Sequence, residues 1–164
     1  LEHIPDLGPV FREIHRLLSP GGILCMTVPT PCFESNTVIN RFLTLLGLRE
    51  LAAQYRRFCS KFIWRQYHYH SLAGWEEMVT EFGFKVLQSS TYDSSSICLI
   101  NDFLYPFGMV GLLNKKLFNR WVLFPSLRKI WIYPLYLLAK YAFKETGSTD
   151  MDGLALLILE KVDV

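Results

Sequence analysis

The sequence lacks the features of a nucleic-acid-binding protein. Its formal net charge is only +2 at pH 7, from 17 Lys and Arg against 15 Asp and Glu. The basic residues are not gathered into an arginine-rich arm, and neither an RNA-binding nor a DNA-binding motif is visible. A charge this small does not argue for phosphate-rich partners. We therefore expect no nucleic acid among the partners of this chain.

Closely spaced metal ligands are missing as well. The four cysteines are scattered at Cys25, Cys32, Cys59 and Cys98. No two of them form a C-x-x-C pair, and His68 and His70 have no Cys or carboxylate nearby at ligand spacing. We therefore expect no metal site, and we expect reduced, packed thiols in a cytoplasmic compartment.

A secretory signal peptide is not seen either, since Leu1–Pro5 has neither a basic flank nor an apolar core. The first residue is not an initiator Met. What the chain does have is an apolar content of 51% and an aromatic content of 15% over 164 residues. This length and composition favour one folded domain with a sizeable core.

The stretch Leu1–Pro29 has the pattern of a loop, a helix, a glycine turn and a strand. Asp6 is a good N-cap for a helix that ends at Leu18. Apolar residues recur there at helical spacing, at Leu7, Val10, Phe11, Ile14, Leu17 and Leu18. Ser19–Gly22 ends the helix, because proline and glycine favour a turn. The apolar run Ile23–Val28, which includes Cys25, predicts a strand buried on both faces, as in a parallel sheet.

A second helix and strand are expected later in the chain. Ser71 is a suitable N-cap for a helix with a buried stripe of Trp75, Met78, Val79 and Phe82. Gly83 is expected at the position after the helix end, where a left-handed backbone is common. The alternation that follows predicts a strand over Phe84–Tyr92.

These two regions resemble parts of class I S-adenosylmethionine-dependent methyltransferases, most closely the small-molecule, type 11 kind. The first match rests on Leu-Glu-His-Ile-Pro-Asp, on Arg-Glu-Ile within the helix, on Leu-Leu-Ser-Pro-Gly-Gly and on the closing Val-Pro. The second runs from His70-Ser71-Leu72 through Trp75 to Phe82-Gly83-Phe84. The resemblance implies the fourth helix and fifth strand, then the fifth helix and sixth strand, and a final antiparallel strand.

The resemblance therefore implies an α/β fold: a partial Rossmann-like sheet of the last strands and helices, in a single partial domain over residues 1–164. The implied cofactor of the complete protein is S-adenosyl-L-methionine. No G-x-G-x-G loop occurs in these 164 residues, and the acidic residue that would hold the ribose after the second strand is absent. We therefore expect the C-terminal half of a longer enzyme, with little cofactor affinity of its own.

Two largely helical insertions are expected to depart from the family pattern. Residues 32–66 are interpreted either as a helical cap over the substrate or as helices that pack in the core. Within and around them, Thr30–Ser35 is expected to be a loop, and Asn36–Leu48 and Leu51–Phe62 to be helices. Residues 93–152 form the second insertion, before a last strand over 153–162.

The second insertion is apolar, aromatic and basic, which leaves two interpretations open. Residues 99–144 either form a cap or dimer surface, or contact a membrane surface peripherally. From Asp93 to Glu145 the acids are Asp93, Asp102 and Glu145. The basic residues in the same stretch are Lys115, Lys116, Arg120, Arg128, Lys129, Lys140 and Lys144. No uncharged run reaches the roughly 18–20 residues of a membrane-spanning helix, which argues against a span.

Candidate cofactor and substrate residues follow from the placement of the strands. In open α/β sheets, ligands lie beyond the carboxyl ends of the strands. The resemblance implies that Leu1, Glu2 and His3 follow the fourth strand, so they are the predicted cofactor-binding residues. Pro29 and Thr30, at the end of the fifth strand, are predicted to bind substrate. Glu2 could instead favour only the helix N-terminus, and His3 could hydrogen-bond only locally.

Candidate catalytic residues are the histidines His3, His68 and His70, because imidazole titrates near neutrality and could take a proton from a hydroxyl acceptor. Methyl transfer from a sulfonium otherwise needs mainly alignment and exclusion of water. Tyr67 and Tyr69 could line an aromatic acceptor pocket. The simpler alternative for His68 and His70 is a surface or capping role.

Two functions are compatible with these observations. The first is methyl transfer from S-adenosylmethionine to a small, hydrophobic or lipid-like acceptor. The enzyme would be cytoplasmic, either associated with a membrane or not. The second is a cofactor-free remnant that acts as a membrane-surface or protein-interaction module.

Overall fold

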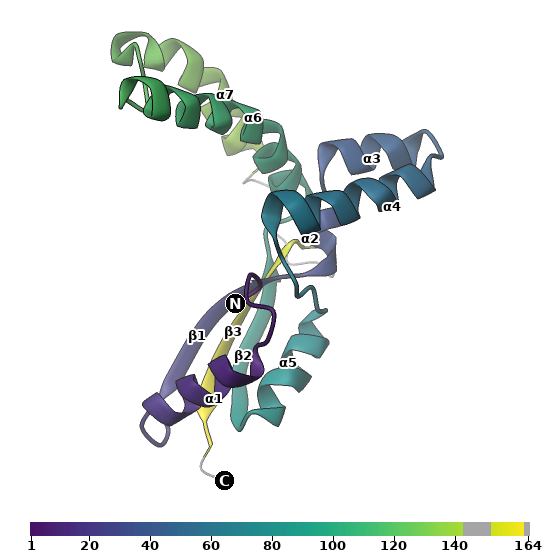
Figure 1. Ribbon diagram of the computed structural model, residues 1–164, viewed down its shortest axis with the longest axis vertical. Coiled ribbons are helices and arrows are strands. Elements are labelled where there is room, and N and C mark those ends of the chain that lie inside the picture. Colours follow the sequence, from purple (N-terminus) through teal and green to yellow (C-terminus); the bar gives the residue numbers. More distant parts are fainter. Residues whose placement is uncertain (143–151, 163–164) are drawn as a thin grey trace.

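The computed structural model describes residues 1–142 and 152–162 and contains one sheet, two helices packed on it and two helical hairpins (Figure 1). Residues 143–151, which belong to the expected insertion 93–152 and in part to the expected membrane contact 99–144, lie outside the described residues. The elements are α1 (Gly8–Leu17), β1 (Ile23–Pro29), α2 (Pro31–Ser35), α3 (Val38–Leu45), α4 (Arg49–Phe58), the π-helix η1 (Cys59–Trp64), α5 (Leu72–Glu81), β2 (Phe84–Tyr92), α6 (Ser95–Phe118), the 3₁₀ turn η2 (Pro125–Leu127), α7 (Arg128–Ala142) and β3 (Leu154–Lys161).

The sheet has the strand order β1-β3-β2, so the last strand in sequence lies in the middle. β3 pairs antiparallel with both neighbours, through Cys25 opposite Ile158 on one side and Ser90 opposite Leu156 on the other. β1 and β2 therefore run parallel to each other. The expected final antiparallel strand is confirmed, as are the bounds of the strand Phe84–Tyr92. The described chain therefore has an α/β fold with a three-stranded sheet, and the Rossmann-like architecture stays a prediction.

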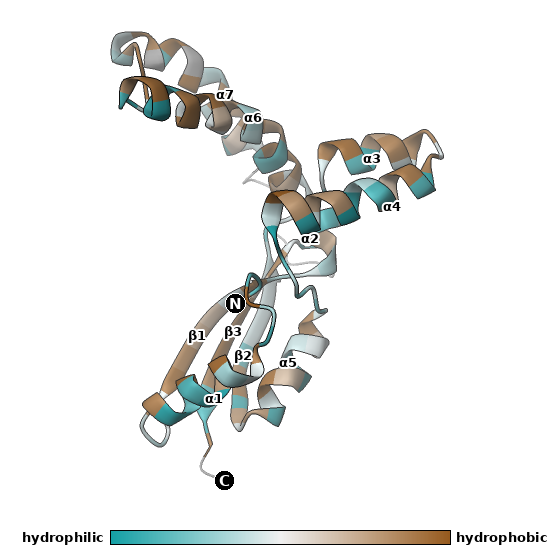
Figure 2. Cartoon of the chain, viewed as in Figure 1, coloured by the Kyte–Doolittle hydropathy of each residue, from teal (hydrophilic) through white to brown (hydrophobic). Residues whose placement is uncertain are grey.

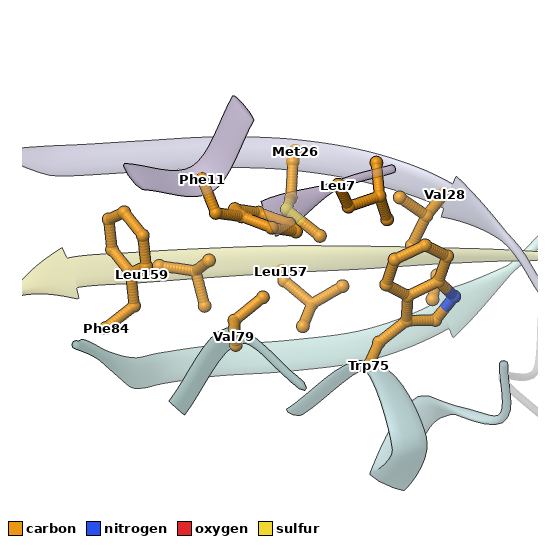
Figure 3. Close-up of a cluster of buried hydrophobic side chains, with 10 residues drawn as sticks. Leu7, Phe11, Met26, Val28, Trp75, Val79, Phe84, Leu157 and Leu159 are labelled. Carbon is orange, nitrogen blue, oxygen red and sulfur yellow. The ribbon is translucent and has the colours of Figure 1, made fainter. Parts of the chain in front are cut away.

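The core lies between the sheet and the pair α1 and α5, which cover the same face (Figure 3). Phe11 of α1 and Trp75 of α5 have no exposed surface, and Leu157 of β3 lies between them. Burying side chains of this size stabilises a fold by roughly 1.5–3 kcal/mol each. The full cluster is Leu7, Phe11, Met26, Val28, Trp75, Val79, Phe84, Ala155, Leu157 and Leu159.

The opposite face of the sheet is not covered by any helix from the described part of the chain. Ile23 is 51% exposed, and Cys25 and Thr27 are also exposed. The prediction that Ile23–Val28 is buried on both faces in a parallel sheet is therefore wrong for this chain, and so is the buried position expected for Cys25. The continuous apolar run in the sequence does not distinguish one covered face from two.

The local signals at the helix ends are largely confirmed. The N-cap of α1 is Leu7, so the N-cap predicted at Asp6 is wrong by one residue, although Asp6 Oδ1 accepts a hydrogen bond from the Gly8 N–H at 2.9 Å. Ser71 Oγ accepts from the Gly74 N–H at 3.2 Å and caps α5. Gly83, with φ of 81°, follows the end of α5 in the left-handed region, as expected.

Both hairpins leave the sheet at the carboxyl ends of β1 and β2 (Figure 1). After β1, Thr30 caps the short helix α2 by accepting from the Cys32 N–H, so the loop expected over Thr30–Ser35 is wrong. α3 and α4 then pack against each other. The apolar side of α3 is turned outward, with Leu45 85% exposed, so core packing of this segment is not observed in the described chain.

The second hairpin contains α6 and α7, which pack against each other and carry a large apolar surface (Figure 2). α6 is one continuous helix of 24 residues that includes Asp102 and Pro106. It is long and apolar enough to cross a membrane by length and composition alone, and almost none of its apolar stretch is buried. Because α6 contains Asp102, Lys115 and Lys116, the observation that no uncharged run reaches roughly 18–20 residues still holds, and length and composition alone do not establish a span.

Candidate functional site

The predicted histidines gather at the carboxyl end of β1. Trp75, near the start of α5, donates its indole N–H to the carbonyl of Pro29 at 3.1 Å, which joins α5 to the end of β1. The His70 ring packs edge-on against Trp75, with ring centroids 4.9 Å apart. The His68 ring stacks on His70 at 5.8 Å. A ladder of three rings thus extends from the core toward the surface.

The amino-terminal residues lie against the same segment. His68 Nε2 is 2.9 Å from the carbonyl oxygen of Ile4, and His3 Nδ1 is 3.2 Å from that of Arg65. The backbone N–H of Tyr67 donates to the Glu2 carbonyl at 2.7 Å. Because a carbonyl oxygen only accepts, Nε2 of His68 and Nδ1 of His3 each carry the proton of their contact. Nδ1 of His68 can then accept a proton. The predicted residues Glu2, His3 and His68 are therefore brought together.

His70 is the member of this group with an unsatisfied atom. Its Nε2 is buried and has no hydrogen-bond partner among the described residues. Burial lowers the pKa of His70 below its ordinary value, and the positive charge of His68 lowers the pKa further. His70 is therefore neutral near pH 7, and a polar ligand atom could satisfy its Nε2.

Pro29 and Thr30 are both buried. Thr30 Oγ1 donates to the Asp152 carbonyl at 2.6 Å, and the Thr30 N–H donates to the Gly153 carbonyl at 2.9 Å. These bonds tie the end of β1 to the start of β3. The polar atoms of this pair are thus engaged in the fold, and substrate binding by Pro29 and Thr30 stays a prediction.

A pocket of about 1010 Å³ lies between α4, η1 and the segment that leads to α5; Tyr67 and Tyr69 of this segment line it, whereas His68 and His70 do not. We call it the basic pocket, because its cationic lining residues are Arg56, Arg57, Lys61 and Arg65. The predicted substrate residues Tyr67 and Tyr69 line it together with Phe62, and its acid in the described chain is Glu34. Of the four predicted substrate residues, Pro29 and Thr30 are therefore buried in the fold, whereas Tyr67 and Tyr69 line the pocket.

The floor of the basic pocket is held by a polar network. Ser60 of η1 donates to the carboxylate of Glu34 in α2, and Tyr69 donates to the side chain of Gln66. Burial raises the pKa of the Glu34 carboxyl, while Tyr69 and Arg56 partly oppose this shift. Burial also raises the pKa of the Tyr69 phenol. The negative charge of Glu34 is therefore disfavoured in a pocket rich in cations.

Comparison with known proteins decides the family. A family model described as a methyltransferase domain matches residues 1–89, which is more than half of the chain. The chain belongs to this methyltransferase family. No curated protein matches the chain. The matched residues of the methyltransferase domain include α1, β1, the histidine group and the basic pocket, and they end within β2.

The resemblance predicted from two short motifs is thereby confirmed at the level of the family. The role of residues 32–66 as a cap and the single partial domain stay predictions. Sequence reasoning missed Glu34 and Arg65 of this methyltransferase domain. Glu34 lies in a segment expected to be a loop, and Arg65 has a left-handed backbone, with φ of 52°, that no local motif indicated. The signal in the sequence that could have indicated a basic site was the cluster of Arg56, Arg57, Lys61 and Arg65.

Proposed function

We propose that this domain takes part in S-adenosylmethionine-dependent methyl transfer to a small acceptor with a hydrophobic part. The observation that carries this proposal is the group of His3, His68 and His70 at the carboxyl end of β1, within the residues that match the methyltransferase family. Ligands of open α/β sheets bind beyond this end of the strands. The basic pocket, lined by Tyr67 and Tyr69 from the same segment as His68 and His70, would supply a place for an acceptor.

When bound, S-adenosylmethionine supplies a methyl group that is already activated for transfer. Leu1, Glu2 and His3 are the residues of this chain that would hold it. Glu2 presents a partly buried carboxylate, with Oε1 3.5 Å from His3 Nε2, and a carboxylate can accept from hydroxyl or ammonium groups. The buried, unpartnered Nε2 of His70 is a further polar atom that fits a ligand at this end.

His68 is the residue we propose as the general base. Its Nε2–H is donated to the carbonyl of Ile4, and a second carbonyl, that of Pro5, lies 3.2 Å away. These contacts hold the ring and direct the lone pair to Nδ1, the arrangement that a base needs. The His70 ring stacks on the His68 ring and helps to keep it in place. Tyr67 and Tyr69 would border the acceptor.

The test is a radiolabelled methyl-transfer assay on the full natural gene product that contains residues 1–164. Amphipathic alcohols and phenols serve as acceptors, with His68→Ala, His70→Ala and His3→Ala as variants. Removal of a general base lowers the rate by roughly 10²- to 10⁴-fold. His15→Ala is the matched control, because His15 contacts the Val162 carbonyl at the opposite end of the sheet. Full activity in all three variants would contradict the site assignment.

A second proposal concerns a peripheral membrane contact through the α6–α7 hairpin, the described part of residues 99–144. Aromatic side chains on it are exposed, among them Phe107 at 57% and Tyr133 at 64%. Exposed cations gather around its turn, at Lys115, Lys116, Arg120 and Lys129. Charges are costly in hydrocarbon, and α7, with 15 residues, is shorter than the roughly 20 that a span requires. We therefore propose that the hairpin lies in the headgroup layer of an anionic membrane.

Vesicle sedimentation tests the membrane proposal. The full gene product is expected to sediment with vesicles that contain anionic phospholipid and to stay in solution with neutral ones. Lys115→Gln/Lys116→Gln is expected to weaken sedimentation, whereas the control Arg12→Gln/Lys85→Gln removes the same charge from α1 and β2. A protein that sediments but neither binds S-adenosylhomocysteine nor transfers methyl groups would instead support the alternative of a cofactor-free membrane module.

A further inference from the structure

The basic pocket combines three features that point to one class of ligand. Its cations come from α4, from η1 and from the residue after η1, and they converge on one cavity. In the described chain, none of them forms an ion pair within 4 Å. Arg56 donates to the side chain of Asn40 at 2.7 Å, and Lys61 lies 5.5 Å from the centre of the Phe62 ring. Glu34 is the one acid of the described chain that lines the pocket, so four cations against one carboxylate leave the pocket a net positive charge.

The walls of the pocket indicate that the ligand is not a bare anion. Phe62 is 61% exposed and Tyr67 is 59% exposed, and both line the cavity beside the cations. Leaving aromatic surface in water is unfavourable, and an apolar ligand body would cover it. The cavity, at about 1010 Å³, is also far larger than a phosphate ion needs and is of the size that takes a drug-like molecule.

The backbone around the pocket is unusual at two adjacent places. η1 is a π-helix of six residues, a conformation that is rare and often found at functional sites. It ends at Arg65, which adopts a left-handed backbone although it is not glycine. This turn places Arg65 on the same cavity as Arg56 and Lys61. Arg56 and Arg57 also lie in the last turn of α4, where cations stabilise the helix dipole, and the experiment has to separate that role from binding.

We propose that the basic pocket binds the phosphate of an amphipathic phosphate ester, and that a hydroxyl group of this ester is the methyl acceptor. Its oxygen would bond to the methyl carbon as the methyl–sulfur bond of the sulfonium breaks, and its proton would pass to Nδ1 of His68. The proposal rests on the proposed methyl transfer and names its substrate class. A phosphate carries up to two negative charges and several acceptor oxygens, so it matches several Arg and Lys donors better than one carboxylate does. The apolar part of the ester lies against Phe62 and Tyr67, and the histidine group borders the same segment.

Binding is tested first by calorimetry with octyl phosphate, without cofactor, on the full natural gene product. Lys61→Gln/Arg65→Gln is the pocket variant, because both side chains are exposed and form no ion pair in the described chain. Arg12→Gln/Lys85→Gln is the control with the same change in charge. We expect the pocket variant to lose about tenfold in affinity per cation removed, and the control to bind as the wild type does. Equal melting temperatures of the two variants exclude a merely structural role.

A second arm distinguishes a soluble ester from a membrane lipid. Vesicles of a zwitterionic phospholipid that also contain phosphatidic acid replace octyl phosphate. If the pocket variant sediments less than the control, the phosphate reaches the pocket from a bilayer. If only octyl phosphate binding falls, the ligand is a soluble ester. Both results support the pocket. Affinity for octyl phosphate and for vesicles that is unchanged in the pocket variant overturns the proposal, and so does octanol binding as tight as that of octyl phosphate.

The two proposals can fail separately. Methyl transfer to uncharged acceptors, with no binding of octyl phosphate, leaves the proposed function in place and removes the phosphate ester as acceptor. Octyl phosphate binding that depends on Lys61 and Arg65, in a protein with no methyl transfer, keeps the phosphate site and removes the proposed function.

Discussion

Asp102 of α6 accepts a hydrogen bond through Oδ2 from the backbone N–H of Val38, the first residue of α3, at 2.9 Å. The first N–H groups of a helix have no partner within the helix, and acidic side chains satisfy them and favour the positive end of the helix dipole. This contact joins the two hairpins where they leave the sheet. The charged residue that interrupts the apolar pattern of α6 is therefore a cap for another helix.

Asp102→Ala is expected to lower the free energy of unfolding by about 1 kcal/mol, because the N–H of Val38 loses its acceptor. Urea unfolding followed by circular dichroism measures the change. Asp102→Asn is the control, since an amide oxygen can still accept from the same N–H. Equal stability of the Ala variant and the wild type would show that solvent replaces this cap without cost.

Trp75→Phe is expected to destabilise the domain by about 1–3 kcal/mol, because a buried carbonyl at the end of β1 loses the indole N–H of Trp75. The matched control is Trp64→Phe. The Trp64 ring packs edge-on against Phe33, and its N–H forms no hydrogen bond in the described part of the chain. Chemical denaturation of both variants gives the comparison, and an equal loss in the two would contradict a special role for the bond to Pro29.

The lowered pKa of His70 predicts that the stability of the domain depends on pH. Its pKa in the folded state is lowered by burial and by the charge of His68, below the ordinary value of about 6.5 that holds in the unfolded chain. The unfolded state therefore binds a proton at a higher pH than the folded state does. The stability that neutral His70 contributes is present above about pH 6.5 and is lost as the pH falls through the lowered pKa.

His70→Gln is accordingly expected to lose less stability than the wild type between pH 7 and pH 5. Melting temperatures measured across this interval provide the test, and the difference between the two proteins isolates His70 from other titrating groups. Parallel curves for the wild type and the variant would be incompatible with a lowered pKa.

Gly153 is expected to tolerate no side chain while Cys98 is present. A Cβ built on Gly153 overlaps the Sγ of Cys98, which is buried at the start of α6. Gly153→Ala is therefore expected to cost about 1–3 kcal/mol through overpacking. In a Cys98→Ala background the same change is expected to cost less, because the space is vacated. A double-mutant cycle by urea unfolding measures this coupling, and strictly additive effects would argue against the contact.

The amino-acid sequence predicted the elements whose signals are local. The helix capped by Ser71, the turn at Gly83 and the strand Phe84–Tyr92 were all expected, and each depends on residues within a few positions of one another. The family was also predicted correctly from two short motifs. The histidines could be named in advance, whereas their arrangement around Trp75 could not.

Other features depend on residues that are distant in the chain. The basic pocket needs Glu34 of α2 together with Arg56 and Arg65, and no periodic pattern links these positions. The exposed side of β1 at Cys25 was not predicted, because an apolar run does not say how many of its faces a neighbour covers. The long helix α6 continues through Pro106, although proline is unfavourable in a helix interior.

By itself, the sequence determined the start of α5, the bounds of β2 and which family the chain belongs to, because caps, turns and short motifs act over a few residues. Only the tertiary structure decided which faces are covered, that Asp102 caps Val38, and that four cations share one cavity with a single carboxylate of the described chain. The physical reason is that burial and charge compensation are set by contacts between segments far apart in sequence, and these contacts exist only once the chain has folded.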